Sequence, residues 1–284
     1  MRRALTPYLL VLPGGLWLLL FFVVPAATML SLSLQEGDVV HGYVFTGHWQ
    51  TYADALVTYR TQFARSLLYG AITTLVLVVV AFPVAYWIAV HGGRRKPVYL
   101  LLLLSPYFVS FVLRTISWRQ LLTDEGVLLG PLKSAGVLGA QFHVLGTPVA
   151  VIGGLVYTFL PFMVLPVYVA LERLDPRVVE AARDLYAGPA AAFRRVVLPL
   201  ALPGVFAGVL MTFVPASSDY VTSAVLGGPS TTMIGQVIQA QYLVSSDYPT
   251  ASALSATLMA VLLSGLFAYA RALGTGDVLT VAAR

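Results

Sequence analysis

Residues 171–199 read LERLDPRVVEAARDLYAGPAAAFRRVVLP and form the most charged stretch of a chain that is otherwise strongly apolar. Asp175 followed by Pro176 is a favoured order at the start of a helix, because Asp accepts a bond from a free backbone N–H and Pro needs no such partner. Gly188 and Pro189 are expected to end that helix. The stretch therefore predicts a short helix between two apolar segments.

This predicted helix has two different faces. At 3.6 residues per turn, one face carries Val178, Ala182, Leu185 and Tyr186, and the other carries Glu180, Arg183, Asp184 and Ala187. The small side chains of Ala181 and Ala182 allow another surface to approach closely. Glu180 offers its charge to a basic group of a partner or to Arg183 in its own helix. By itself, this pattern also fits an ordinary amphipathic helix at a membrane surface.

The composition places the chain in a membrane. Of its 284 residues, 58% are hydrophobic and 10% are charged, and the mean hydropathy is +0.85. Soluble domains usually carry about 25% charged residues. The net charge of +5 does not indicate nucleic acid as a partner, since the basic residues of membrane proteins collect in cytoplasmic loops. Because cysteine is absent, disulfides, thiolate metal sites and thiol nucleophiles are excluded.

Six segments are long and apolar enough to cross a bilayer as helices, which takes about 20 residues. They are 8–34, 66–90, 98–122, 148–171, 200–226 and 249–273. The first is longer than the apolar region of a signal peptide, about 7–15 residues, so it is expected to be retained. The sequence therefore predicts an all-α integral membrane protein with six transmembrane helices in a single transmembrane domain, 1–284.

The positions of the basic residues predict the orientation. With the N-terminus in the cytoplasm, 12 of the 17 Lys and Arg residues lie on the cytoplasmic side. Cytoplasmic loops carry this excess in membrane proteins, so an N-in, C-in topology is expected. Two long connections, 35–65 and 123–147, are then external. Their Gly, His, aromatic and acidic residues predict ordered lids or short interfacial helices.

The segment between the fourth and fifth predicted spans resembles a known motif. Glu180-Ala181-Ala182, followed by Gly188, Phe193, Val197, Pro199 and Pro203, is similar to the cytoplasmic coupling motif of ABC importer permeases. In that family the helix docks into a groove of the ATP-binding subunit and transmits the closure of that subunit to the membrane helices. The resemblance implies a coupling loop at about 173–199 and the following coupling residues: Glu180, Ala181, Ala182, Asp184, Tyr186, Gly188, Phe193 and Pro199.

One position departs from the pattern of that family. The family usually has Gly four residues after the second Ala, and Tyr186 stands there in this chain. A Tyr is strained where the backbone needs a positive φ. The turn is therefore expected either to move to Gly188 or to meet an altered groove on the partner.

Shorter motifs are similar to the spermidine/putrescine branch of these permeases. They are Arg114-Thr-Ile-Ser-Trp118, Leu226-Gly-Gly-Pro229, Met233-Ile-Gly235 and Asp247-Tyr-Pro249. The same branch also contains permeases for other small organic or inorganic solutes. The resemblance implies a multi-pass protein of the bacterial plasma (inner) membrane. The implied partners are a second homologous permease subunit, two ATP-binding subunits that hold ATP and Mg, and a periplasmic or extracytoplasmic solute-binding protein.

The chain carries no recognisable catalytic motif of its own. Neither lysine, Lys96 or Lys133, ends a Gly-rich phosphate loop, no Gly-x-Ser-x-Gly occurs, and no two histidines have a His-x-x-x-His spacing. We therefore expect a non-catalytic subunit with no metal or cofactor of its own. A secondary transporter would need acidic relays within the spans, for which Asp219 is the one hint. A membrane enzyme or scaffold would need a catalytic cluster or a soluble domain.

Five residues are candidates for the solute pathway: Asp219, Tyr220, Arg114, Trp118 and Tyr157. Charged groups inside a membrane are costly and usually face protein or water. Asp219 beside Tyr220 suits a solute that carries an ammonium group, and a polar helix end at the outer interface explains the pair equally. Arg114 either lines the path or pairs with an acid such as Asp124 or Asp219. Trp118 also fits an interfacial anchor, and Tyr157 also fits ordinary helix packing.

Two further features concern packing and helix ends. Gly204 and Gly208 form a small-xxx-small pair that allows close contact with another helix, within the chain or at a subunit interface. Asp247 is expected to form a turn or cap ahead of Pro249.

Overall fold

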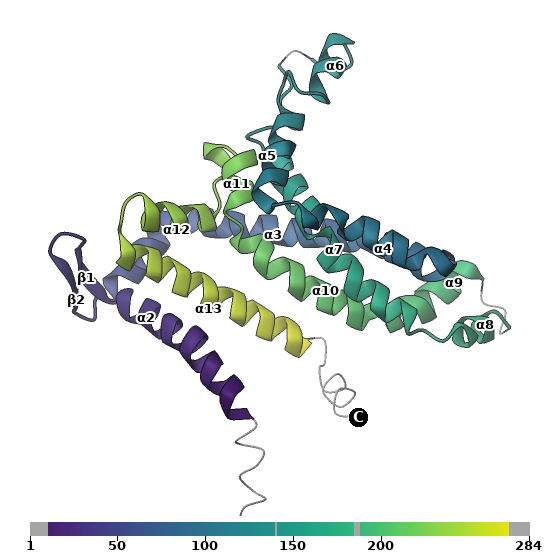
Figure 1. Cartoon of the computed structure of the whole chain (residues 1–284), viewed down its shortest axis with the longest axis horizontal. Helices are drawn as coiled ribbons and strands as arrows, with labels where there is room; N and C mark the ends of the chain where they lie inside the picture. The colour runs from purple at the N-terminus through teal and green to yellow at the C-terminus, as the bar shows by residue number, and fades with distance from the viewer. Residues whose placement is uncertain (1–10, 140, 185–187, 273–284) are drawn as a thin grey trace, which may run out of the picture. The chain divides into compact units, whose positions relative to one another are not determined.

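The computed structural model describes residues 11–139, 141–184 and 188–272, and most of these residues are helical (Figure 1). The chain divides into two compact units. One combines Met1–Thr61 with Val237–Ser264, and the other combines Gln62–Gln236 with Gly265–Arg284. Three helices run from one unit into the other: α3 (Gln50–His91), α12 (Ile234–Leu243) and α13 (Tyr248–Ala272).

The first unit contains the N-terminal helix and a β-hairpin. A π-helical turn, η1 (Leu19–Val23), leads into α2 (Val24–Leu32). Strands β1 (Gln35–Asp38) and β2 (Gly42–Phe45) then pair in antiparallel fashion, with Asp38 opposite Gly42. The Oη of Tyr43 on β2 donates to the carbonyl of Ser246 at 2.9 Å, which ties the hairpin to the segment before α13.

This hairpin corrects the prediction of an all-α protein, because segment 35–65 folds as two strands followed by the start of α3. Gly37 and Gly42 adopt φ values of 135° and 84°, which few other residues tolerate. The Asp38 carboxylate accepts bonds from the backbone N–H groups of Val40 and His41 at 2.9 and 2.7 Å. Hydrogen bonds from the His41 side chain and backbone lower the pKa of Asp38 below its usual range.

The second unit contains the helices between α3 and α12. They are η2 (Gly93–Arg95), α4 (Lys96–Leu104), η3 (Ser105–Phe108), α5 (Phe111–Leu122), α6 (Leu129–Ser134), α7 (Pro148–Glu172), α8 (Pro176–Asp184), α9 (Pro189–Ala192), η4 (Phe193–Val197), α10 (Leu198–Ser218), α11 (Val221–Leu226) and η5 (Pro229–Thr231). Helix α6 lies in segment 123–147, where the sequence predicts a short interfacial helix or a lid.

Five helices in the described chain are long and apolar enough to cross a membrane. They are Val11–Leu32, Gln50–His91, Pro148–Glu172, Pro189–Ser218 and Tyr248–Arg271. A further candidate is a bent pair, Gly93–Phe108 and Phe111–Leu122, whose two parts meet at 90°. A mostly helical protein with five or six candidate spans is thereby confirmed.

Two of the predicted spans are not single helices. Segment 98–122 breaks at Val109 and Ser110, whose ψ values of 143° and 135° are extended. Pro106 lies just before the break and has no N–H with which to continue the helical hydrogen bonds. Segment 200–226 breaks at Asp219, where ψ is 122°, and the short helix α11 follows. Apolar composition does not report either break, because the residues on both sides remain suited to lipid.

Helices α7 and α10 pack together extensively within the second unit. Gly204 and Gly208 are buried on α10 at this contact. A side-chain carbon at Gly204 would meet the carbonyl of Pro166 and the backbone of Val167, and one at Gly208 would meet Met163. The small-residue pair therefore serves packing within the chain, which was one of its two predicted roles.

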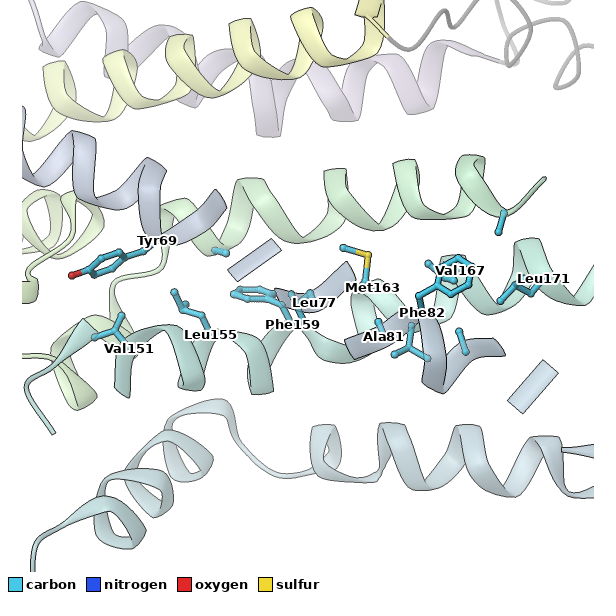
Figure 2. Packing of buried hydrophobic residues seen from close by; sticks show 14 of the residues in the cluster. Tyr69, Leu77, Ala81, Phe82, Val151, Leu155, Phe159, Met163, Val167 and Leu171 are labelled. Atoms are coloured by element: carbon cyan, nitrogen blue, oxygen red, sulfur yellow. The ribbon is translucent and has the colours of Figure 1, made fainter. Parts of the chain in front are cut away.

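The main apolar core lies around this helix pair and the second half of α3. Figure 2 shows the side chains that line it: Tyr69, Leu77, Ala81 and Phe82 from α3, and Val151, Leu155, Phe159, Met163, Val167 and Leu171 from α7. Leu77, Leu155 and Met163 are completely buried. Since the segment α8–α9 connects α7 to α10, both of its ends are attached to this core.

Enlarging Gly204 is expected to destabilise the protein by about 1–3 kcal/mol, the usual cost of overpacking a close-packed core. In Gly204→Leu the new side chain meets backbone atoms of Pro166 and Val167, which cannot rotate away. The matched control is Gly153→Leu on α7, where an added carbon meets no atom within 4 Å. Thermal unfolding in detergent checks the prediction. Equal melting temperatures for the two variants would contradict the close α7–α10 contact.

Candidate functional site

The predicted coupling helix is present as α8, between α7 and α10 (Figure 1). It begins at Pro176, as the sequence predicts. The carboxylate of Asp175 accepts a hydrogen bond from the backbone N–H of Arg177 at 3.0 Å, which is the predicted cap. The helix ends at Asp184. Tyr186 belongs to 185–187, which lies outside the described residues.

The predicted contact residues of α8 are open to the surroundings in the isolated chain. Glu180, Ala181 and Asp184 are exposed, and Ala182 is partly buried. On the face that was predicted to be apolar, Val178 is still 44% exposed. A strongly two-faced helix with this exposure presents a surface that another protein or a membrane interface can cover.

Gly188 does not provide the left-handed turn that the sequence allowed there. Its φ of −62° and ψ of 163° are extended backbone, which any residue adopts. Gly188 instead precedes α9, which begins at Pro189. The expectation that the family's turn, with its positive φ, moves to Gly188 is therefore wrong.

The segment after Gly188 is attached firmly to the core. Helix α9, the π-helical segment η4 and α10 follow one another without a break. The ring of Phe193 packs edge-on against Phe82 at 5.6 Å and against Tyr86 at 5.7 Å, both on α3. Ala192 and Val197 are buried on either side, whereas Pro199 at the start of α10 is exposed. Among the predicted coupling residues that the structure describes, Phe193 is thus the one that packs against the core.

A cavity of about 520 Å³ adjoins the start of α8. Its polar lining consists of Lys96, Glu172, Asp175 and Glu180, and its apolar lining includes Tyr86 and Val197. The Nζ of Lys96 forms an ion pair with Glu172 at 2.8 Å. This pair joins the start of α4 to the end of α7 beside α8. Sequence patterns do not predict this ion pair, because its two residues are 76 positions apart.

Asp219 caps a helix end. Its carboxylate Oδ1 accepts a hydrogen bond of 2.6 Å from the backbone N–H of Thr222, in the first turn of α11. Asp219 is partly buried and Tyr220 is 46% exposed. The structure therefore supports the interpretation of Asp219 as a polar helix end, and a contact with solute is compatible with that position.

Arg114, Trp118 and Tyr157 come together in an aromatic cluster. The guanidinium of Arg114 lies 4.2 Å from the centre of the Tyr107 ring and 6.0 Å from the centres of both Phe111 and Tyr157. The Trp118 ring packs against Tyr157 at 5.2 Å. Phe111 and Trp118 are three and four residues from Arg114 on α5, so helical spacing indicated their part of the cluster. The contribution of Tyr157 depends on how α5 and α7 pack.

The suggested ion pair of Arg114 with Asp124 or Asp219 is wrong. Asp124 pairs with Lys133 at 3.0 Å. Asp219 is held by the backbone of Thr222. Within the described residues Arg114 has no ion pair with a carboxylate.

The first unit contains a polar pocket that the sequence did not indicate. It has a volume of about 380 Å³, and Glu36, His48, Asp54, Tyr59 and Asp247 are among the residues that line it. Glu36 contacts His48, and Asp247 accepts a bond from the backbone N–H of Thr250 at 3.1 Å. The latter bond confirms that Asp247 caps the start of α13.

Comparisons with known proteins agree on one family. Residues 56–273 match the family described as binding-protein-dependent transport system inner membrane component. The chain is 34% identical to the spermidine/putrescine transport system permease protein PotB of Haemophilus influenzae over 257 residues, 90% of each chain. It is 35% identical to PotB of Escherichia coli K12 over 259 residues, 90% of this chain and 94% of that one. A bacterial alginate ABC transporter in complex with an alginate pentasaccharide-bound periplasmic protein has the same fold, with a TM-score of 0.67, 18% identity, and coverage of 98% and 96%.

Proposed function

Because this chain belongs to the family of binding-protein-dependent transport system inner membrane components, we propose that it forms half of the translocation pathway of an ATP-driven importer of polyamines. As a permease of an ABC importer it is a multi-pass protein of the inner membrane, and ATP is hydrolysed by separate subunits. The observation that carries the proposal is that helix α8 is exposed and lies in the chain between two apolar helices of membrane-spanning length.

The coupling residues act as a lever in this proposal. The exposed side of α8, with Glu180, Ala181, Ala182 and Asp184, docks on an ATP-binding subunit. The resemblance assigns Tyr186 and Gly188 to the same contact. Phe193 then carries the movement into the core through its contacts with Phe82 and Tyr86. Docking drives transport only if the ATP-bound and ATP-free states of the partner hold α8 differently.

The complex assigned to this chain has several other members. A second, homologous permease subunit forms the other half of the pathway, and two ATP-binding subunits hold ATP and Mg. A solute-binding protein delivers the cargo from outside. The alginate transporter, which was solved together with its periplasmic protein, supports that last partner.

We place both termini in the cytoplasm, with the bent pair around Val109 crossing the membrane as one of six spans. The excess of Lys and Arg in the segments that this topology assigns to the cytoplasm supports the orientation. The coupling helix then lies on the side where ATP is available.

Single-cysteine labelling tests the orientation, since the chain has no cysteine of its own. Arg173→Cys and Ser134→Cys introduce thiols at exposed positions, the first directly after α7 and the second in segment 123–147, which precedes α7. A membrane-impermeant maleimide added to intact cells is expected to label Ser134→Cys, and to label Arg173→Cys only after the membrane is opened. The reverse pattern would rule out the N-in, C-in topology.

The similarity to two PotB proteins supports a polyamine as the cargo, and another small organic or inorganic solute is the alternative. Asp219 and Tyr220 suit this cargo, because a carboxylate and an aromatic face both attract ammonium groups. A secondary transporter that works without an ATPase is the remaining alternative. It would function without any docking at α8.

Uptake of labelled spermidine tests the cargo. The complete complex is reconstituted in liposomes with ATP inside and the binding protein outside. Uptake is expected to require ATP and to be reduced by excess unlabelled putrescine. In Asp219→Asn the amide oxygen still accepts the Thr222 bond, so the variant removes charge and keeps the cap. We expect it to raise the KM for spermidine about tenfold, equivalent to about 1.4 kcal/mol.

Asp247→Asn is the matched control for that variant, because Asp247 also caps a helix through the backbone N–H three residues later. It is expected to change the KM much less. Spermidine uptake that ignores ATP would favour a secondary transporter. A complex that hydrolyses ATP with its binding protein but does not transport spermidine would point to another solute.

A further inference from the structure

The guanidinium of Arg114 contains buried donors that have no acceptor. Its Nε and Nη1 atoms are buried and have no hydrogen-bond partner of good geometry among the described residues, although the side chain as a whole is only partly buried. The Oη of Tyr107, whose ring lies under the guanidinium, is also buried, and it makes at most a poorly aligned hydrogen bond with the same guanidinium. Buried polar groups in proteins nearly always have partners, so two such donors on one charged side chain call for an explanation.

The aromatic rings around Arg114 do not supply the missing partner. Ring faces attract the positive charge, but they do not replace the hydrogen bonds that the N–H groups make in water. A buried charge is normally paired with an opposite charge that also accepts hydrogen bonds. The aromatic cluster therefore encloses the guanidinium but offers no well-placed hydrogen-bond acceptor for its buried N–H groups.

The guanidinium of Arg114 lies at membrane depth, so any acceptor that pairs with it must be at that depth too. Arg114 contacts the ring of Tyr157, which lies roughly 14 Å along α7 from Pro148 at 1.5 Å per residue. Tyr107 packs against Phe162, about one and a half turns further along the same helix. A solute-binding protein that docks at the membrane surface would have to insert a segment to this depth to reach Arg114. A polyamine offers ammonium donors and no acceptor.

We propose that Arg114 forms an ion pair with a carboxylate of the second permease subunit. This inference rests on the proposed two-permease pathway and deepens it, because it places one charged contact between the two halves. The carboxylate accepts the free N–H bonds of the guanidinium, and the rings of Tyr107, Phe111 and Tyr157 shield the pair from water. Arg suits this role because its planar fork stacks on rings and bonds carboxylates at once.

Site-specific photo-crosslinking in the complete complex tests the contact. Arg114→benzoylphenylalanine is expected to crosslink to the second permease subunit, and mass spectrometry then identifies a peptide that contains Asp or Glu. Leu113→benzoylphenylalanine, at an exposed neighbouring position on α5, shows which crosslinks are not specific to position 114. A product only with the binding protein, with lipid or within the same chain, or no product, overturns the proposal.

Charge removal on both sides then tests the ion pair. Arg114→Gln and the matching Asp→Asn or Glu→Gln in the second permease are each expected to reduce its retention on the tagged chain at least about tenfold, because each leaves one buried group unpaired. The double variant is expected to restore most of the retention, since neither charge remains. Arg119→Gln removes an exposed charge from the same helix and is expected to leave retention unchanged.

The two readouts separate this inference from the proposed function. If the wild-type chain retains no second permease, the two-permease pathway itself is wrong. If the second permease is retained but the single and double variants show additive losses, the pathway stands and the Arg114 ion pair is wrong.

Discussion

The close contact between α7 and α10 is the constraint on which the rest of this structure depends. In lipid, apolar side chains gain little by leaving the solvent, so helices associate where small residues let them pack closely. Gly204 and Gly208 provide that surface against Val167 and Met163. The charged segment that carries α8 connects these two helices and no others. The charged helix that we propose as a lever is thus attached at both ends to a close helix contact.

This attachment explains how a short helix can act on a membrane pathway. α8 is exposed, but the chain on its C-terminal side is held by Phe193 between Phe82 and Tyr86. On its N-terminal side, Lys96 and Glu172 join α4 to α7. In the proposed mechanism, a displacement of α8 therefore passes to α3, α4, α7 and α10 together. Because α4 belongs to the bent pair that contains Arg114, the same movement then passes to the aromatic cluster.

The sequence predicted best what is decided locally. The start of α8 depends on Asp175 and Pro176, two adjacent residues whose capping chemistry is the same in any fold. It did not predict the break at Val109 and Ser110 or the hairpin at Gly37 and Gly42, because neither feature changes the number or the length of the apolar segments. Glu172 and Lys96, like Arg114 and Tyr157, come together only through helix packing. The coupling role proposed for α8 depends on family resemblance, because spacing alone predicts an ordinary surface helix there.

Co-purification of the ATP-binding subunit with the tagged chain from native membranes tests the central claim most directly. Glu180→Ala removes the exposed charge of α8, and Glu125→Ala removes an exposed charge of the segment placed on the opposite side of the membrane. The account predicts that the subunit is recovered with the wild type and with Glu125→Ala, and that Glu180→Ala reduces its recovery at least about tenfold, equivalent to about 1.4 kcal/mol or more. A wild-type chain that purifies without any ATP-binding subunit, or equal recovery with both variants, would contradict the account.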